Sequence, residues 1–250
     1  AELFAAVGDR MVSIENSPMA TGGTVWFANS AGLVQGYDIA ALLSGQDRDA
    51  ALVLEWRAGD DVDATLVGGP EGEIYVAVED ERPASTDKTA TGHLARLNPT
   101  RPEAPLDWSL AFPETYLGDG GLWATPALYR GHLYVQTHAG GLFAIEAASG
   151  RITQEIAAAA HGWSSPVVVA EQLLLGNCDG DLTAYSLSDP AHPQEIWRFR
   201  PVGAGCWEST PAVWDGVIYL GNRNGFFYAI GEGGAQWARA EDGLADAALQ

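Results

Sequence analysis

The fold is decided by a segment that the chain repeats. Residues 123–145 read WATPALYRGHLYVQTHAGGLFAI, residues 163–185 read WSSPVVVAEQLLLGNCDGDLTAY, and residues 208–230 read ESTPAVWDGVIYLGNRNGFFYAI. Two more diverged copies precede them and begin near Glu15 and Asp63. If the strand starts at 18, 66, 126, 166 and 211 are equivalent, the repeat steps are 48, 60, 40 and 45 residues. Self-similarity at this period indicates a repeat architecture.

Each copy predicts four short strands. Ser/Thr-Pro-x-Val reads as a buried inner strand, because proline is tolerated at the first residue of a strand. A turn such as Arg130-Gly131 or Asp215-Gly216 follows, then a strand of the type Leu-Tyr-Val, a glycine-containing hairpin and a strand of the type Leu-Phe-Ala-Ile. A final outer strand often carries a tryptophan. Units of this length without helical periodicity are typical of propeller blades. The sequence therefore predicts an all-β chain, a β-propeller of four-stranded antiparallel blades.

The predicted blades form a single domain over residues 1–250. Five full repeats are expected at 15–56, 63–108, 123–156, 163–197 and 208–237, with partial blade strands at 3–14 and 244–250. Two insertions, near 81–91 and 100–120, are rich in Pro, Thr, Asp and Gly and are expected to be surface loops. Two interpretations of the ends are open. They either combine into a sixth blade, or the chain is a fragment of a larger propeller, which we favour because a gene seldom ends as a strand begins.

Composition and charge exclude several classes of protein. The chain is 47% hydrophobic, so it is not intrinsically disordered. Its net charge of −20 repels phosphate backbones, which argues against nucleic-acid binding. The longest apolar runs are far too short for membrane insertion. No basic segment with an apolar run behind it precedes Glu2, so an export signal would lie outside this sequence.

The repeat resembles that of the pyrroloquinoline-quinone-like (PQQ-like) propellers of bacteria. The resemblance rests on Gly/Asn-x-x-Gly-x-Leu/Phe-x-Ala-Ile/Tyr after Ser/Thr-Pro-x-Val, and on phrases such as residues 12–16, 27–36 and 206–214. This superfamily includes quinoprotein alcohol dehydrogenases and the propeller lipoprotein of the outer-membrane assembly machine. The resemblance covers essentially the whole chain and implies the fold. It also implies an extracytoplasmic location, that is periplasmic, secreted or in the cell envelope.

Propeller topology predicts one shared opening at the central channel. The loops that lead into the inner strands emerge there, and so do the hairpins between the second and third strands. The candidate ligand-binding residues at this channel mouth are Glu15, Asn16, Asp63, Trp123, Trp163, Trp207 and Glu208. Acids, amides and indoles in one opening suit a small-molecule site. In the alternative interpretation the indoles pack between blades and the acids accept backbone N–H groups.

Metal and cofactor chemistry have only partial support. Residues 60–63 read DDVD, and Asp61 and Asp63 are candidate calcium ligands, but the glycine and terminal glutamate of a calcium loop are missing. We therefore assign no metal. A PQQ site with Ca²⁺ would need Glu, Asn and Asp ligands, and quinoprotein dehydrogenases add a pair of adjacent cysteines. Glu15-Asn16 is the only Glu-Asn pair and no cysteines are adjacent. PQQ with Ca²⁺ is kept only as an alternative.

The two cysteines, Cys178 and Cys206, lie in loops predicted on the same face of neighbouring blades. A disulfide between them would imply an oxidising compartment. The alternative is two separate buried thiols. His138 and His161 can approach the channel face but have no nucleophile beside them in the repeat.

These observations lead to two functional hypotheses. The first is a non-catalytic extracytoplasmic scaffold that binds a protein, a small molecule or a glycan, with any remaining blades of a longer chain as further partners. The second is a quinoprotein-type oxidoreductase or a carbohydrate-active enzyme, with indoles as stacking platforms and acids as catalytic groups at the channel mouth. An enzyme needs two acids within reach of one atom in the pocket, whereas a scaffold does not. We favour the scaffold.

Overall fold

The strands form five four-stranded antiparallel sheets that follow one another along the chain. The computed structural model describes residues 12–80, 92–112, 115–157, 161–232 and 234–239. The first blade contains β1 (Met19–Thr21), β2 (Thr24–Ala28), β3 (Leu33–Asp38) and β4 (Leu52–Arg57). The second contains β5 (Val67–Gly68), β6 (Ile74–Ala77), β8 (Leu94–Leu97) and β9 (Leu106–Leu110). The third contains β12 (Ala127–Tyr129), β13 (His132–Gln136), β14 (Leu142–Glu146) and β15 (Ile152–Ile156).

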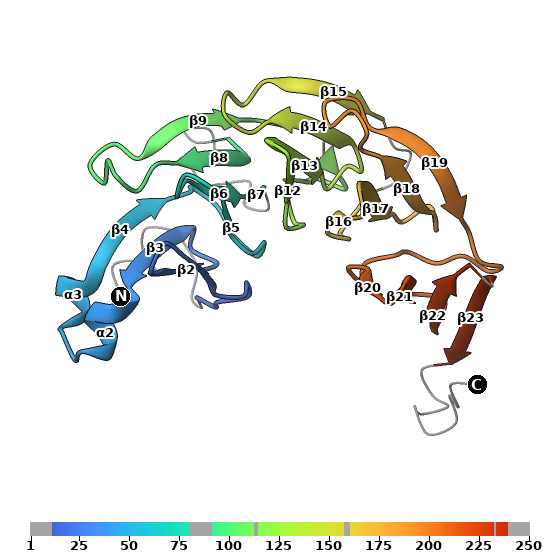
Figure 1. Ribbon diagram of the computed structural model, residues 1–250, viewed down its shortest axis with the longest axis horizontal. Coiled ribbons are helices and arrows are strands. Elements are labelled where there is room, and N and C mark those ends of the chain that lie inside the picture. Colours follow the sequence, from blue (N-terminus) through green and yellow to red (C-terminus); the bar gives the residue numbers. More distant parts are fainter. Residues whose placement is uncertain (1–11, 81–91, 113–114, 158–160, 233, 240–250) are drawn as a thin grey trace.

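The last two blades have the same strand order. The fourth contains β16 (Val167–Val169), β17 (Gln172–Gly176), β18 (Leu182–Ser186) and β19 (Gln194–Phe199). The fifth contains β20 (Ala212–Trp214), β21 (Val217–Asn222), β22 (Phe226–Gly231) and β23 (Gly234–Arg239). In Figure 1 the blades fan out along an arc, with β5, β12, β16 and β20 on its inner side and β4, β9, β15 and β19 on its outer side. The prediction of an all-β propeller built from four-stranded antiparallel blades is confirmed.

The first two strands of four blades are joined by two-residue turns in which both residues have positive φ. Gly22-Gly23, Arg130-Gly131, Ala170-Glu171 and Asp215-Gly216 occupy these turns. Such turns match the right-handed twist of the paired strands and therefore suit a tight hairpin. Glycine, which adopts positive φ without steric cost, occupies both positions of the first turn and the second position of the Arg130-Gly131 and Asp215-Gly216 turns, whereas Ala170-Glu171 has no glycine.

The hydrophobic core lies between blades rather than within them. Trp26 and Leu54 of the first blade, for example, pack against Ile74 and Val76 of the second. Equivalent clusters fill the second–third, third–fourth and fourth–fifth interfaces. The middle strands therefore have a neighbour on both faces, and β14 has four buried residues in succession. This double burial explains why these strands read as continuous apolar runs and not as apolar–polar alternation.

Hydrogen bonds between equivalent positions tie successive blades together. Ser17 N donates to Thr65 Oγ1 (3.2 Å), Thr65 N donates to Thr125 Oγ1 (3.0 Å), and Thr125 N donates to Ser165 Oγ (3.0 Å). These partners are 48, 60 and 40 residues apart, which are the repeat steps read from the sequence. The hydroxyl of the residue before Leu66, Pro126 or Pro166 is therefore a link between blades.

The connection between β3 and β4 differs from the sequence-based expectation. Two short helices, α2 (Ile39–Leu43) and α3 (Arg48–Ala51), lie between β3 and β4 and were not predicted. Asp38 and Asp47 cap them by accepting backbone N–H groups, which makes these helical turns favourable. None of the described helices is long and apolar enough to span a membrane.

The second insertion, at 100–120, is not a simple loop. It contains β9, the outer strand expected at the end of the repeat over 63–108, and it also supplies two strands that were not expected, β10 (Thr115–Tyr116) and part of β11 (Asp119–Gly121). Both β10 and β11 join β7 (Glu79–Asp80) in a three-stranded sheet. The first insertion, at 81–91, lies outside the described residues, as do most of the partial blade strand at 3–14 and all of that at 244–250. Residues 12–14 are described and form no strand.

Candidate functional site

The loops that lead into the inner strands lie against the hairpins between the second and third strands. His138 N donates to the Gly121 carbonyl (2.9 Å), Cys178 N to the His161 carbonyl (3.1 Å), and Arg223 N to the Cys206 carbonyl (3.0 Å). The same contact therefore recurs in the third, fourth and fifth blades. It brings two sets of chemically varied side chains together, and we call this side of the arc the channel face.

Alternation along the leading segment decides which side chains are accessible on this face. In the second, third and fifth blades, the residue four positions before Leu66, Pro126 or Pro211 points into the core: Val62, Leu122 and Trp207 have no exposed surface. The next residue points out, so Trp123 and Trp163 are partly exposed. This is the period of two that extended backbone imposes.

Trp207 was predicted at the channel mouth, and that prediction is wrong. Its indole is completely buried, Nε1 donates to the Gly180 carbonyl (2.8 Å), and the ring packs edge-on against Tyr228 with centroids 5.2 Å apart. It lies on the core side of the alternation, one residue away from the accessible position of Glu208. Trp207 therefore holds the fourth and fifth blades together and offers no face to a ligand.

The core position of Trp207 is matched by a small residue in the preceding blade. A Cβ on Gly176 would lie 2.6 Å from Trp207 Cβ, so the close approach of the two segments requires glycine. One blade earlier the sizes are exchanged, because the side chain of Gln136 fills the space beside Gly162. The third–fourth and fourth–fifth interfaces thus each combine one large and one small residue at these two positions.

The predicted Glu15-Asn16 pair does not act as one site. The Asn16 amide is buried and donates to the carbonyls of Ala28 (3.0 Å) and Val62 (2.7 Å), while its oxygen accepts from Ala28 N (3.2 Å). Asn16 is therefore a link between the first two blades and not a ligand-binding residue. Glu15 is exposed and accepts from Ser13 Oγ (2.6 Å). Because the Asn16 side chain is hydrogen-bonded to backbone groups, the Glu15-Asn16 pair does not fit a calcium–PQQ site.

The other acidic candidates have different surroundings. Asp61 is buried and Asp63 is partly buried, and neither carboxylate is without an interaction partner. We assign no metal to them. Glu208 is partly buried and forms an ion pair with Arg223 (Oε2 to Nε, 2.8 Å).

Five rings from three loops form a continuous group, which we call the aromatic cluster: Tyr116, Trp123, His138, His161 and Trp163. The indoles of Trp123 and Trp163 stack with centroids 5.3 Å apart and planes within 13°. Trp123 also stacks on His138 (4.3 Å), and Tyr116 stacks on His161 (4.2 Å). Trp163 Nε1 donates to His138 Nδ1 (3.1 Å).

The pKa of His138 is consistent with its role as a hydrogen-bond acceptor in the aromatic cluster. Burial, followed by the neighbouring His161, lowers the pKa of His138, with Asp119 opposing the shift. This lowered pKa favours the neutral imidazole, which agrees with Nδ1 accepting the hydrogen bond from Trp163 Nε1. The guanidinium of Arg223 lies 5.9 Å from the centre of the Trp163 ring, at the edge of the cluster.

The sequence pattern indicated only part of the aromatic cluster. Trp123 and Trp163 were candidates because they precede the repeated proline, and the structure brings them together. His138 and His161 were noted only as able to reach this face. Tyr116 was missed because it belongs to the insertion, where the repeat gives no register. Pairing of β10 with β11 places it beside His161.

The predicted disulfide is confirmed. Cys178, in the hairpin of the fourth blade, is bonded to Cys206, in the segment leading into the fifth. The two residues are separated by 28 positions. The bond lies beside the aromatic cluster, because the backbone N–H of Cys178 contacts the carbonyl of His161.

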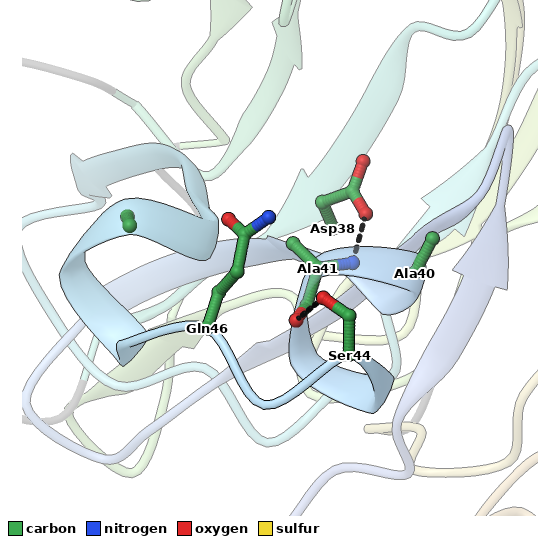
Figure 2. Close-up of a pocket in the computed structure, with 6 residues that line it drawn as sticks. Asp38, Ala40, Ala41, Ser44 and Gln46 are labelled. Carbon is green, nitrogen blue, oxygen red and sulfur yellow. Dashed lines mark hydrogen bonds between the residues drawn. The ribbon is translucent and has the colours of Figure 1, made fainter.

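A separate hollow of about 480 Å³ lies between the helices of the first blade. Figure 2 shows two hydrogen bonds within its lining: Asp38 accepts from Ala41 N (2.7 Å) and Ser44 Oγ donates to the Ala41 carbonyl (2.8 Å). These are helix-capping contacts. The hollow therefore belongs to the helical connection between β3 and β4 and is not a second part of the channel face.

Nearly the whole chain matches a known protein family. The family described as outer membrane protein assembly factor BamB matches residues 17–249. The chain belongs to this family. The match confirms the resemblance to PQQ-like propellers.

Solved structures show the same fold. BamB from Moraxella catarrhalis superposes with a TM-score of 0.65 at 15% identity, covering 91% of this chain and 63% of that one. A computationally designed protein, Ika8, superposes with a TM-score of 0.63 at 13% identity, covering 90% of this chain and 60% of that one. The chain thus spans less than two thirds of either structure. No curated protein matches the sequence.

Proposed function

We propose that this chain is a non-catalytic, extracytoplasmic scaffold that binds a polypeptide segment of another protein on its channel face. The contact surface is the aromatic cluster together with Arg223. The membership of the BamB family, which is described by an assembly function, supports a scaffold or binding role.

The observation that carries the proposal is the composition of the cluster at an accessible edge of the fold. Trp, Tyr and Arg are the residues most enriched among those that dominate protein–protein binding energy. Tyr116 is 37% exposed, Trp123 and Trp163 are partly exposed, and Arg223 stands over Trp163. The rings support one another by stacking, so they lose little conformational freedom when a partner binds.

The distribution of acids argues against the enzyme hypothesis. Glu15, Asp63 and Glu208 belong to segments leading into the first, second and fifth blades, and the first and fifth blades lie at the two ends of the arc in Figure 1. Glu208 is also neutralised by Arg223. General acid–base catalysis needs side chains within hydrogen-bond reach of the groups that exchange protons, and the paired Glu208 belongs to the blade at the opposite end of the arc from that of Glu15.

The location rests on the disulfide. Disulfides form and persist in oxidising compartments and are rare in the cytosol, where thiols are kept reduced. The Cys178–Cys206 bond supports an extracytoplasmic place of action.

The test is calorimetric titration of the purified chain with three classes of probe. These are an unfolded outer-membrane β-barrel polypeptide, a glycan panel, and PQQ with Ca²⁺. We expect saturable binding of the polypeptide only. The double variant Trp123→Ala/Trp163→Ala should weaken it about thirtyfold, as loss of a dominant contact does. Trp214→Ala is the matched control, because Trp214 is 77% exposed on β20 and lies outside the cluster.

The outcomes separate the hypotheses. Polypeptide binding that survives in the double variant, or falls equally in the control, would refute the proposed surface. Binding of a glycan or of PQQ that is lost in the double variant would instead support the enzyme hypothesis.

A further inference from the structure

Four potential metal ligands meet beside the aromatic cluster. The imidazole of His161, the two sulfurs of Cys178 and Cys206, and a carboxylate oxygen of Glu208 all lie within 4.8 Å of one another. All four residues are partly buried. They come from two blades: the segment leading into β16, the β17–β18 hairpin, and the segment leading into β20.

The backbone and the neighbouring side chains hold these groups in place. Cys178 N donates to the carbonyl of His161, and Arg223 N donates to the carbonyl of Cys206. The His161 ring stacks on Tyr116. The four potential metal ligands are therefore held close together before any metal binds.

Glu208 provides a further observation. One carboxylate oxygen, Oε2, is occupied by Arg223, but Oε1 is buried and no hydrogen bond from the described part of the chain reaches it. A buried carboxylate oxygen without a partner is costly. Glu208 Oε1 is therefore an acceptor that a bound cation could satisfy.

We propose that these four residues form a redox-gated zinc site. In the disulfide form the sulfurs are bonded to each other and do not ligate. In the dithiol form the site offers two thiolates, one imidazole and one carboxylate, which are the ligand types of zinc. Tetrahedral Zn²⁺ with Zn–S bonds of about 2.3 Å needs sulfurs only about 3.8 Å apart, so opening the disulfide requires a small separation and no rearrangement of the blades.

The chemistry balances with an external dithiol as the reductant. The Cys178–Cys206 bond breaks and takes up two electrons and two protons, giving two thiols, while the dithiol becomes a disulfide. Zn²⁺ then displaces the two thiol protons to solvent. The bound ion with two thiolates and one carboxylate carries one net negative charge, and the guanidinium of Arg223 stands beside it to offset this charge.

This site goes beyond the proposed scaffold function and does not depend on it. The zinc site would nevertheless be connected to the proposed binding surface, because His161 is both a metal ligand and a member of the aromatic cluster. Coordination of the His161 imidazole would reorient its ring relative to Tyr116 and Trp163, so the redox state of the cysteines would change the surface of the aromatic cluster.

The test compares the oxidised and dithiol-reduced protein after removal of the dithiol under anaerobic conditions. Co²⁺ is the spectroscopic probe, because tetrahedral thiolate ligation gives intense visible absorption, and Zn²⁺ is then added in competition with a chromophoric chelator. We expect one equivalent of Co²⁺ to bind to the reduced protein, to be displaced by Zn²⁺, and to be released on reoxidation. The oxidised protein should bind none.

Ligand variants identify the site. His161→Ala and Glu208→Gln should each weaken Zn²⁺ binding by at least about tenfold, since even residues that only support a ligand contribute this much. His192→Ala and Glu171→Gln are the matched controls, because His192 pairs with Asp189 and Glu171 with Arg130 at exposed positions. Circular dichroism of every variant checks that it is folded.

Each result decides the proposal. Loss of affinity in the two ligand variants but not in the controls supports the four-residue site. Absence of stoichiometric Co²⁺ binding by the folded reduced protein overturns it. Binding that is unchanged in His161→Ala and Glu208→Gln also overturns it, because the two thiols would then be acting alone.

Discussion

The interface between the fourth and fifth blades should depend heavily on one side chain, Trp207. Truncation by Trp207→Ala removes an indole with no exposed surface. Removal of a buried aromatic ring from a core costs about 3–5 kcal/mol, because transfer energy and cavity formation add. The carbonyl of Gly180 also loses its hydrogen bond from Nε1. We therefore expect the free energy of unfolding to fall by about 4 kcal/mol.

A size exchange tests the same contact more sharply. Gly176→Gln alone would force a side chain against Trp207, where even a Cβ would come within 2.6 Å. Combined with Trp207→Gly, it reproduces the arrangement of Gln136 and Gly162 one interface earlier. We expect the double variant to be more stable than the sum of the single effects predicts, by about 0.5–3 kcal/mol or more.

Guanidinium unfolding followed by circular dichroism measures these effects, with Trp214→Ala as the control. Trp214 is 77% exposed, so its truncation should change stability by less than about 0.5 kcal/mol. If Trp207→Ala costs no more than Trp214→Ala, or if the two exchanged positions are simply additive, the description of this blade interface is refuted.

Four further predictions follow from other contacts. Replacing both Cys178 and Cys206 by serine should lower stability by about 3.6 kcal/mol, the loop-entropy value for a separation of 28 residues, as measured by unfolding without reductant. Asn16→Ala should cost about 1–3 kcal/mol in the same assay, because it leaves buried backbone groups of two blades without their partner. Hydrogen bonding to two arginines lowers the pKa of Asp181, so its stabilising contribution is complete above about pH 4 and is lost as the pH falls through the lowered folded value; Asp181→Asn should flatten that part of the acid unfolding profile. Burial lowers the pKa of His138, so its contribution is complete above about pH 6.5 and is lost as the pH falls toward the folded value; His138→Phe should remove this dependence.

Each of these has a contrary result. Equal stability of the serine variant and the wild type would show that the disulfide does not constrain the unfolded chain. A neutral Asn16→Ala would mean that its amide is not needed by the backbone. An unchanged acid profile in either of the two titration variants would show that the corresponding group does not control stability in its pH range.

Much of the fold was predictable because the same blade motif recurs five times in the sequence. Chance resemblance is averaged out over five copies, and the steps between them reappear as the spacing of the hydrogen bonds from Ser17 to Thr65 and from Thr65 to Thr125. The insertion could not be placed in this way. Its residues have no equivalent in other copies, so the strands that carry Tyr116 were expected to be loop.

The sequence predicted which face of the propeller carries the candidate site, but not which side chains are accessible on that face. Trp163 and Trp207 look alike in sequence, since both stand just before a Ser/Thr-Pro motif. A shift of one position along extended backbone sends one to the surface and the other into the core. In retrospect Gly176 is a signal for the buried tryptophan, but its meaning appears only when the two segments are adjacent.

The sequence by itself determined the blade, its order of strands and the face on which the loops gather, because these depend on local hydrophobic pattern, turn residues and repetition. Only the tertiary structure decided which rings stack, that Asn16 serves the backbone, and that His161, Glu208 and the two cysteines meet. Those contacts join residues from different blades, and their distances depend on how the blades pack rather than on any pattern within a blade.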